Sequence, residues 1–163
     1  GARLDVPEWV GWGAFSQSTR YSFPLLQAWR ISENSMARSK YLNAALLNLD
    51  AQLGANPQAV SFITGLGARA PKDPLHMSSI YDQVKKPVPG IPVFGLAAHL
   101  ANSNKYYIAS QSDDNSYPYR NGVMDPYPVL RRYIDAHELV PMSEFTIVDM
   151  ATCAGVFGLL DDQ

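Results

Sequence analysis

The sequence has little charge and no concentration of positive charge. Charged residues make up 17% of the 163 residues, and the formal net charge is −2. Proteins that bind nucleic acid usually present clustered Lys and Arg, so we expect no nucleic-acid partner. The sequence also lacks an apolar stretch of the length that a membrane span requires, so we expect no membrane association.

Cysteine is almost absent, and the one that occurs, Cys153, cannot form a disulfide within the chain. It lies in an apolar run, so we expect an inert thiol in the core. The chain begins with Gly1 and not with Met, so no targeting segment can be read from it. Hydrophobic residues make up 47% of the sequence, which is typical of a globular domain with its own core.

Two stretches have the apolar spacing of helices. The clearer one places five apolar residues on one helical face and is followed by Gly54 and Pro57, which end a helix: Leu42, Ala45, Leu46, Leu49 and Leu53. An earlier helix is expected from about Phe23 to Ile31. Pro24 would lie in its first turn, or would kink a helix that began earlier.

The remaining elements are short or irregular. Ser61 to Thr64 is compatible with an extended piece, and short helices are expected over 93–100 and 126–135. Ser143 is a possible N-cap of a helix that is apolar nearly all round and should therefore be buried. Between them, residues 65–124 carry many prolines and little periodicity, which predicts long structured loops.

Three blocks of sequence, in this order and spacing, resemble family 9 glycoside hydrolases, a group dominated by cellulases. The first contains Leu53-Gly54-Ala55-Asn56-Pro57 and continues into Ser61-Phe62-Ile63-Thr64-Gly65-Leu66-Gly67. The second is Pro71-Lys72-Asp73-Pro74-Leu75-His76-Met77-Ser78, followed by Pro87-Val88-Pro89-Gly90. The third is Asp135 followed by Ser143-Glu144-Phe145-Thr146-Ile147, similar to the "NEVAI" of the family.

This resemblance implies an all-α fold that forms part of an (α/α)6 barrel with long loops. Residues 1–163 would be the C-terminal portion of one catalytic domain. The N-terminal helices of the family, and the Asp pair that positions its nucleophilic water, have no counterpart in the sequence. We therefore expect a missing N-terminal part, in the same or another chain, as a partner, and no glycosidase activity from this chain alone.

The resemblance also assigns candidate site residues. Glu144 falls on the general acid of the inverting family mechanism. His76 falls on the second His of the "HHR" substrate-binding motif, in which Leu75 and Met77 replace the other two polar residues. Asp135 matches an acidic position upstream of the acid, where it could orient the loop that carries Glu144 or contact substrate.

Aromatic side chains are a further set of candidates for sugar binding. Tyr117, Tyr119 and Tyr127 precede the acid in the sequence and could stack on pyranose faces, although packing of the loop is an equally good interpretation. Asp113-Asp114-Asn115 offers hard oxygen atoms to calcium but lacks the rest of a calcium loop. We therefore expect no cofactor, with structural calcium as an open alternative.

The function expected from these residues is hydrolysis of β-1,4-glucosidic bonds in cellulose or related oligosaccharides. One alternative is an exo-acting β-glucosidase or exo-β-glucosaminidase on short oligosaccharides, because two polar residues of the "HHR" motif are replaced. Another alternative is a non-catalytic carbohydrate-binding fragment, which would predict a β-sandwich. We expect a β-linked glucan or glucosaminide as ligand, and a secreted or periplasmic location in a bacterium.

Overall fold

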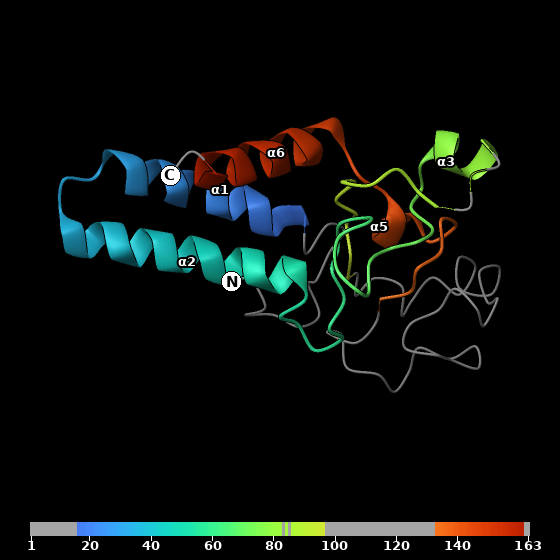
Figure 1. Cartoon of the computed structure of the whole chain (residues 1–163), viewed down its shortest axis with the longest axis horizontal. Coiled ribbons are helices and arrows are strands. Elements are labelled where there is room, and N and C mark those ends of the chain that lie inside the picture. Colours follow the sequence, from blue (N-terminus) through green and yellow to red (C-terminus); the bar gives the residue numbers. More distant parts are fainter. Residues whose placement is uncertain (1–15, 83, 85, 97–132, 162–163) are drawn as a thin grey trace.

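The computed structural model describes residues 16–82, 84, 86–96 and 133–161. Within these ranges the secondary structure is helical, with no β-strand, which confirms the all-α prediction for this part of the chain. The helices are α1 (Ser16–Ile31), α2 (Ser35–Leu53), α3 (Met77–Tyr81), α5 (Val140–Ser143) and α6 (Ile147–Asp161). Three long helices lie side by side at one end of the molecule, and the two short ones lie among loops at the other (Figure 1).

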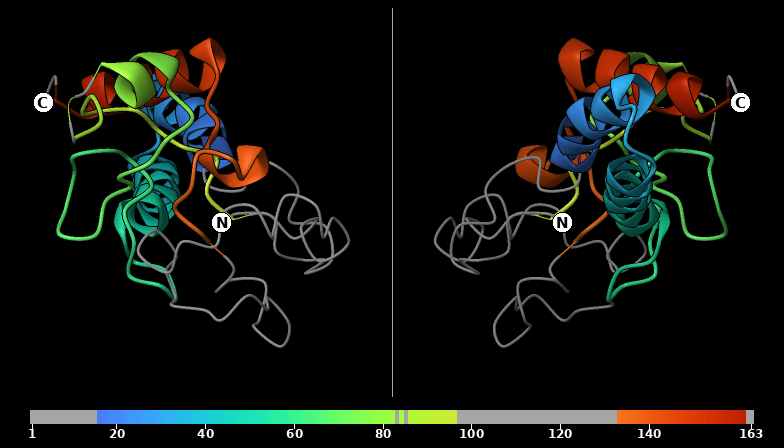
Figure 2. Two further views of the ribbon diagram at one scale, coloured as in Figure 1. Left: turned by 90° about the vertical axis from the view of Figure 1, so that its right-hand side faces the viewer. Right: turned by 90° about the vertical axis from the view of Figure 1, so that its left-hand side faces the viewer.

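Helix α1 packs against both α2 and α6 and lies between them (Figures 1 and 2). The three helices share a core of five buried residues: Leu26, Trp29, Ala45, Leu49 and Val156. Burying one such side chain contributes about 1.5–3 kcal/mol. The apolar spacing predicted for α2 from the sequence therefore marks the face of this helix that packs into the core.

Both predicted helices exist, but each begins earlier than its apolar pattern. In α2 the side chain of Asn34 accepts the N–H of Ala37 at 2.9 Å, which caps the helix before the first apolar residue. Gly54, with a φ of 125°, ends α2 as predicted. Pro24 lies inside α1, so of the two alternatives the helix that began earlier is correct.

Helix α6 begins at Ile147 and not after Ser143, so the predicted cap is wrong. Ser143 ends α5, and the hydroxyl of Thr146 accepts the N–H of Asp149 at 3.1 Å. Asp149 also pairs with Arg20 at 3.0 Å, which ties the start of α6 to α1. Capping by Thr146 is favoured because Asp149, three residues later, forms a reciprocal hydrogen bond with its hydroxyl.

The predicted burial of α6 holds on one face only. Cys153 and Val156 are buried against α1, whereas Ile147 is 84% exposed and Val148 is also exposed. Burial is the main cause that raises the pKa of the Cys153 thiol to about 11, with the charge of Asp149 second, so this core cysteine is inert as expected. Among the described helices α1 makes the main contact with α6, and the apolar side chains of Ile147 and Val148 remain exposed.

Residues Val140–Asp161 are long and apolar enough to pass a test of length and composition for a membrane span, with a mean hydropathy of 1.3. Two structural features count against that interpretation. Residues 144–146 interrupt the helix, and the buried Asp149 carries a charge that is paired with α1. Such apolar helices also occur in the cores of globular proteins, which fits the contact with α1.

The loops at the other end form a second core around one extended segment, residues 91–96. Its backbone donates to two other segments: Val93 to Phe62 at 2.9 Å, Phe94 to Glu144 at 2.8 Å, and Gly95 to Met142 at 2.9 Å. Two of its residues, Val93 and Leu96, belong to a core of nine buried residues, and the other seven come from neighbouring segments: Val60, Phe62, Tyr133, Ile134, Ala136, Leu139 and Met142. This segment therefore holds the backbone of Glu144 in place through the hydrogen bond from Phe94.

These contacts decide three of the local predictions. The extended piece at 61–64 is confirmed in outline, since Ile63 forms an isolated antiparallel bridge with Pro92. The helix expected over 93–100 is wrong for 93–96, because their N–H groups bond to other segments and not along a helix. The helix expected over 126–135 is wrong for 133–135, which are not helical; residues 97–100 and 126–132 lie outside the described residues.

Two leucines of α2 provide a matched test of the helical core. Leu49 is 2% exposed and Leu47 is 70% exposed in this chain. We expect Leu49→Ala to lower the free energy of unfolding by about 2–5 kcal/mol, because it leaves a cavity among α1, α2 and α6. Leu47→Ala is the control. Denaturant unfolding measures both, and a loss for Leu49→Ala of under about 1 kcal/mol would contradict this core.

Candidate functional site

Two of the predicted site residues lie on neighbouring segments. The backbone N–H of Leu75 donates to the carbonyl of Ser143 at 3.0 Å, which joins the loop before α3 to the end of α5. One residue further along each segment are His76 and Glu144. The rings of His76 and Phe145 are also in contact, with centroids 5.8 Å apart. The fold thus brings together residues that are far apart in the sequence.

Glu144 lies in the short link between α5 and α6, half-buried and with extended backbone angles (φ −72°, ψ 163°). Its N–H donates to Val140 at 3.1 Å, and its carbonyl accepts from Phe94. The backbone on either side of the side chain is therefore held firmly. The expectation that Glu144 lies at the N-terminus of a helix is wrong, since α6 begins three residues later.

His76 caps α3. Its Nδ1 accepts the N–H of Ser79 at 3.3 Å and lies 2.8 Å from the Ser79 hydroxyl oxygen. An Nδ1 that accepts from the backbone places the ring proton on Nε2. The cap therefore fixes both the orientation of the ring and its tautomer, which leaves Nε2–H as the atom able to donate to a ligand.

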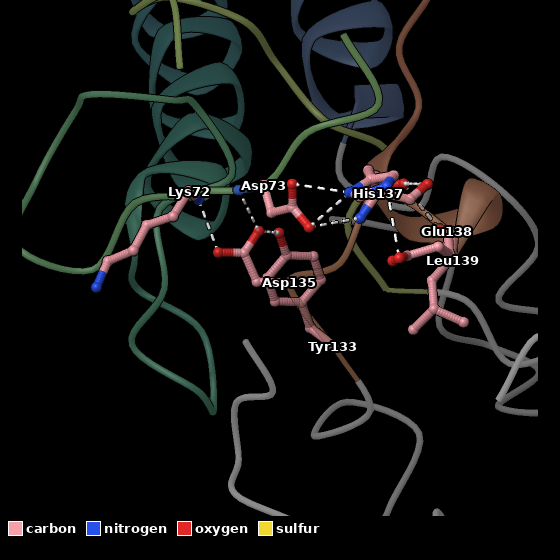
Figure 3. Close-up of polar contacts among 8 residues, drawn as sticks. Lys72, Asp73, Tyr133, Asp135, His137, Glu138 and Leu139 are labelled. Carbon is pink, nitrogen blue, oxygen red and sulfur yellow. Dashed lines mark hydrogen bonds and ion pairs between the residues drawn. The ribbon is translucent and has the colours of Figure 1, made fainter. Parts of the chain in front are cut away.

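Asp135 and Asp73 form a reciprocal arrangement that we call the aspartate clasp (Figure 3). The carboxylate of Asp135 accepts the backbone N–H of Lys72 at 2.7 Å and of Asp73 at 3.2 Å. The carboxylate of Asp73 in turn accepts the backbone N–H of His137 at 3.0 Å and lies 2.9 Å from its ring Nδ1. Each segment thus holds the other by its backbone.

Burial shapes the protonation of this arrangement. Removal from water is the main cause that raises the pKa of the Asp135 carboxyl, while hydrogen bonds from Lys72 and Asp73 act in the opposite direction. Burial also raises the pKa of the phenol of Tyr133 well above its usual value, with the charge of Asp135 as the second cause. Tyr133 donates to Asp135 at 3.2 Å, so this phenol remains a neutral donor.

The clasp borders a pocket of about 210 Å³ and a possible metal-binding set. The pocket is lined by charged, polar and apolar side chains from three segments: Lys72, Asp73, Pro74, Ser79, Ile80, Val84, Pro87 and His137. Ligand atoms of Asp73, His137 and Glu138 lie within 4.8 Å of one another. One imidazole and two carboxylates are a donor set that suits zinc better than calcium.

The remaining predicted residues are not placed. Tyr117, Tyr119 and Tyr127, and the calcium candidate Asp113-Asp114-Asn115, lie outside the described residues. Sequence reasoning in turn missed Asp73 and His137 as site residues. They are 64 positions apart, and no periodicity links them. The only signal was that Asp73 lies within the second block of resemblance to the family and that His137 comes two positions after Asp135.

The sequence matches the profile of Glycosyl hydrolase family 9 over residues 5–157. The chain belongs to this family. A curated relative, the xyloglucan-specific endo-beta-1,4-glucanase BoGH9A of Bacteroides ovatus, is 35% identical over 77 residues, which are 47% of this chain and 13% of that protein. The family membership confirms the resemblance read from the three blocks of sequence.

Solved structures show the same fold. A Bacteroides ovatus GH9 structure superposes with a TM-score of 0.69 at 23% identity, over 93% of this chain and 22% of that one. A Zn-binding triple mutant of the GH family 9 endoglucanase J30 superposes with a TM-score of 0.66 at 24% identity, over 96% of this chain and 26% of that one. AaCel9A in complex with cellobiose-like isofagomine superposes with a TM-score of 0.65 at 22% identity, over 93% of this chain and 26% of that one.

This family 9 chain therefore forms part of an (α/α)6 barrel and spans only about a quarter or less of the relatives that it matches. The helices of the described residues and their match to family 9 enzymes also argue against the β-sandwich that a separate carbohydrate-binding module would have. Metal binding in the J30 structure belongs to an engineered mutant of another protein.

The raised pKa of Asp135 predicts a pH-dependent stability. The pKa of Asp135 in the folded state is above the unfolded value of about 3.9. The stability that this carboxyl contributes is therefore fully present below about pH 3.9 and is lost as the pH rises through the folded-state pKa. The free energy of unfolding of the native protein, relative to Asp135→Asn, should therefore fall between about pH 4 and that folded value. Denaturant unfolding at several pH values measures it.

The control for this experiment is Asp50→Asn, which changes an exposed carboxylate on α2. Asp135→Asn also changes the hydrogen bonds that Asp135 accepts from Lys72 and Asp73. These bonds favour the ionised carboxyl, and their effect is already contained in the net upward direction of its pKa shift. A difference between native and Asp135→Asn protein that does not vary with pH would contradict the effect of burial on this carboxyl.

Proposed function

We propose that the protein hydrolyses β-1,4-glucosidic bonds of cellulose or related oligosaccharides by inversion, with Glu144 as the general acid. The observation that carries the proposal is the position of Glu144, half-buried in a rigidly bonded link beside the loop of His76. Membership of family 9 supports it. The relative from Bacteroides ovatus is an endo-beta-1,4-glucanase, and from it we take only the β-1,4-linked backbone as substrate class.

The chemistry divides between two carboxyl groups. A general acid protonates the glycosidic oxygen as the bond breaks, while a carboxylate on the opposite face activates water, about 6.5–9.5 Å away. In the proposed mechanism Glu144 supplies the proton. His76, with its proton on Nε2, would donate to a sugar hydroxyl and hold the ring that is cleaved. As the bond from the anomeric carbon to the leaving oxygen breaks, a bond from that carbon to the water oxygen forms, and the proton lost by the water goes to the opposite carboxylate. All atoms and protons come from water, substrate and these two carboxyl groups, so the proposed reaction requires no cofactor.

We propose that another part of a family 9 domain, in the same or another chain, completes this site and supplies the water-activating Asp pair. The exposed apolar side chains Ile147, Val148 and Leu47 support this, because such surfaces usually mark a contact. In the complete protein, Leu47→Ala would then cost more than the change of about 0.5 kcal/mol typical of a solvated position. A secreted or periplasmic location in a bacterium fits a polysaccharide substrate and is part of the proposal.

Glu144→Gln tests the assignment of the acid, because it keeps the size of the side chain and removes its transferable proton. In the complete enzyme we expect turnover of natural substrate to fall about 10²–10⁴-fold. The loss should be smaller for aryl glycosides with activated leaving groups, which need little protonation. The basic limb of the pH–rate profile should also disappear. Steady-state kinetics on both substrate types measure these effects.

The matched control is Glu33→Gln, which makes the same chemical change at an exposed position between α1 and α2. It should leave turnover unchanged. Near-normal turnover of natural substrate by Glu144→Gln would remove Glu144 from the mechanism.

A second candidate function is exo-acting cleavage of short β-glucosides or glucosaminides. Leu75 and Met77 flank His76 where the family has polar residues, and Met77 is exposed at the start of α3. The tyrosines 117, 119 and 127 and Asp135 remain proposed sugar ligands. Because apolar side chains stand at two positions that are polar in the family, binding of a long polymer would be weakened more than binding of a short oligosaccharide.

This difference predicts specificity. We expect the complete enzyme to act faster on cellobiose-sized substrates or chitosan oligomers than on carboxymethylcellulose. Met77→Arg should raise activity on the polymer by about tenfold, since a charged hydrogen bond contributes about 1.5–3 kcal/mol. Met36→Arg, at an exposed position on α2, is the control. Random internal cleavage with a clear preference for polymer would refute the exo-acting alternative.

A further inference from the structure

The aspartate clasp does more than connect two loops, because its contacts form a closed circuit through the residue before Glu144. Asp73 holds His137 through two kinds of donor, the backbone N–H and the ring Nδ1. The hydroxyl of Ser143 lies 3.1 Å from the carbonyl oxygen of His137. The carbonyl of Ser143 accepts the N–H of Leu75, which brings the circuit back to the loop of Asp73.

Ser143 is completely buried, so its position follows the residues that it contacts. Its hydroxyl is also within 3.0 Å of the carbonyl of Leu139, which anchors it to α5. Glu144 and His76 each extend from this circuit, one residue beyond Ser143 and Leu75 respectively. A change in the Asp73–His137 contact would therefore shift Glu144 relative to His76, the two residues that the proposed function places at the substrate.

The contact between Asp73 and His137 depends on which ring nitrogen of the histidine carries a proton. Both carboxylate oxygens lie within 3.0 Å of Nδ1, so this nitrogen donates to Asp73. On the other side of the ring, Nε2 lies 3.4 Å from Glu138. Because both oxygens of Asp73 already accept from Nδ1, the geometry is that of a hydrogen bond from the imidazole to the carboxylate and not of three ligands that converge on a metal ion.

We propose that Asp73 and His137 are positioning residues for the general acid Glu144, acting through Ser143; this rests on the proposed function. Their contact sets the distance between the proton of Glu144 and the glycosidic oxygen of a substrate bound by His76. A misplacement of about 1 Å at a reacting centre can cost about 10²-fold in rate. Loss of the Asp73–His137 contact should thus slow proton transfer from Glu144 to the glycosidic oxygen and leave substrate binding largely intact.

Two substitutions of His137 separate positioning from general stability. His137→Asn places an amide N–H close to where Nδ1–H lies, so it keeps the contact with Asp73. His137→Gln places its amide nearer to Nε2 and loses that contact. In the complete enzyme, His137→Gln should lower kcat on natural substrate by about 10–10²-fold, with KM little changed. His137→Asn should stay within a few-fold of native.

The decisive readout is the dependence on the leaving group. If the clasp acts through Glu144, His137→Gln and Asp73→Asn should be nearly native on activated aryl glycosides, which need little protonation. Adding His137→Gln to Glu144→Gln should cause no further loss on natural substrate, because two changes that remove one function are not additive. Melting temperatures of all variants show whether each one is folded.

The outcomes separate the two proposals. An equal loss by His137→Gln on both substrate types, or a full additional loss in the Glu144→Gln background, would overturn the positioning role while leaving Glu144 as the acid. Equal effects of His137→Asn and His137→Gln would overturn it as well. Should His137→Gln fail to fold, Asp73→Asn carries the same comparison. Near-normal turnover by Glu144→Gln would instead overturn the function on which the inference rests.

Discussion

The arrangement of the site depends on one exchange of hydrogen bonds, in which Asp73 and Asp135 each hold the backbone of the segment that carries the other. Carboxylates accept backbone N–H groups strongly, and here they replace the ladder of a regular sheet. Because the exchange joins residues 72–73 to residues 135–137, it sets the relation between the loop of His76 and the loop of Glu144. At the helical end the side-chain to backbone bonds between helices run the other way, from a donor to a carbonyl, as from Arg30 to Leu159 at 2.9 Å and from Ser22 to Ala45 at 3.3 Å.

The molecule therefore divides its tasks between two ends. At one end α1, α2 and α6 form a conventional helical layer with an apolar core. At the other end the backbone is mostly irregular, and cross-segment bonds around residues 91–96 take the place of secondary structure. The division fits a family 9 chain that forms part of an (α/α)6 barrel, in which helices provide the scaffold for the connecting loops. Loops carry function most often where a rigid scaffold positions them.

Prediction from the sequence succeeded where the physics is local. The spacing from Leu42 to Leu53 and the glycine after it identified α2, because helical periodicity and capping involve neighbouring residues only. It failed at residues 93–96 and 133–135, where backbone donors bond to segments far away in the sequence. It failed also at Ser143, because the hydroxyl of Thr146, three residues later, accepts the N–H of Asp149, and Arg20 of α1 pairs with that aspartate.

By itself the sequence determined the family, the helical class and the identity of Glu144 and His76 as candidates, because short motifs in a fixed order carry that information. Only the tertiary structure decided that Asp135 anchors a loop and that Asp73 meets His137. Those contacts join residues up to 64 positions apart, and no local pattern specifies which carboxylate will reach which backbone. The chain must fold before such partners exist.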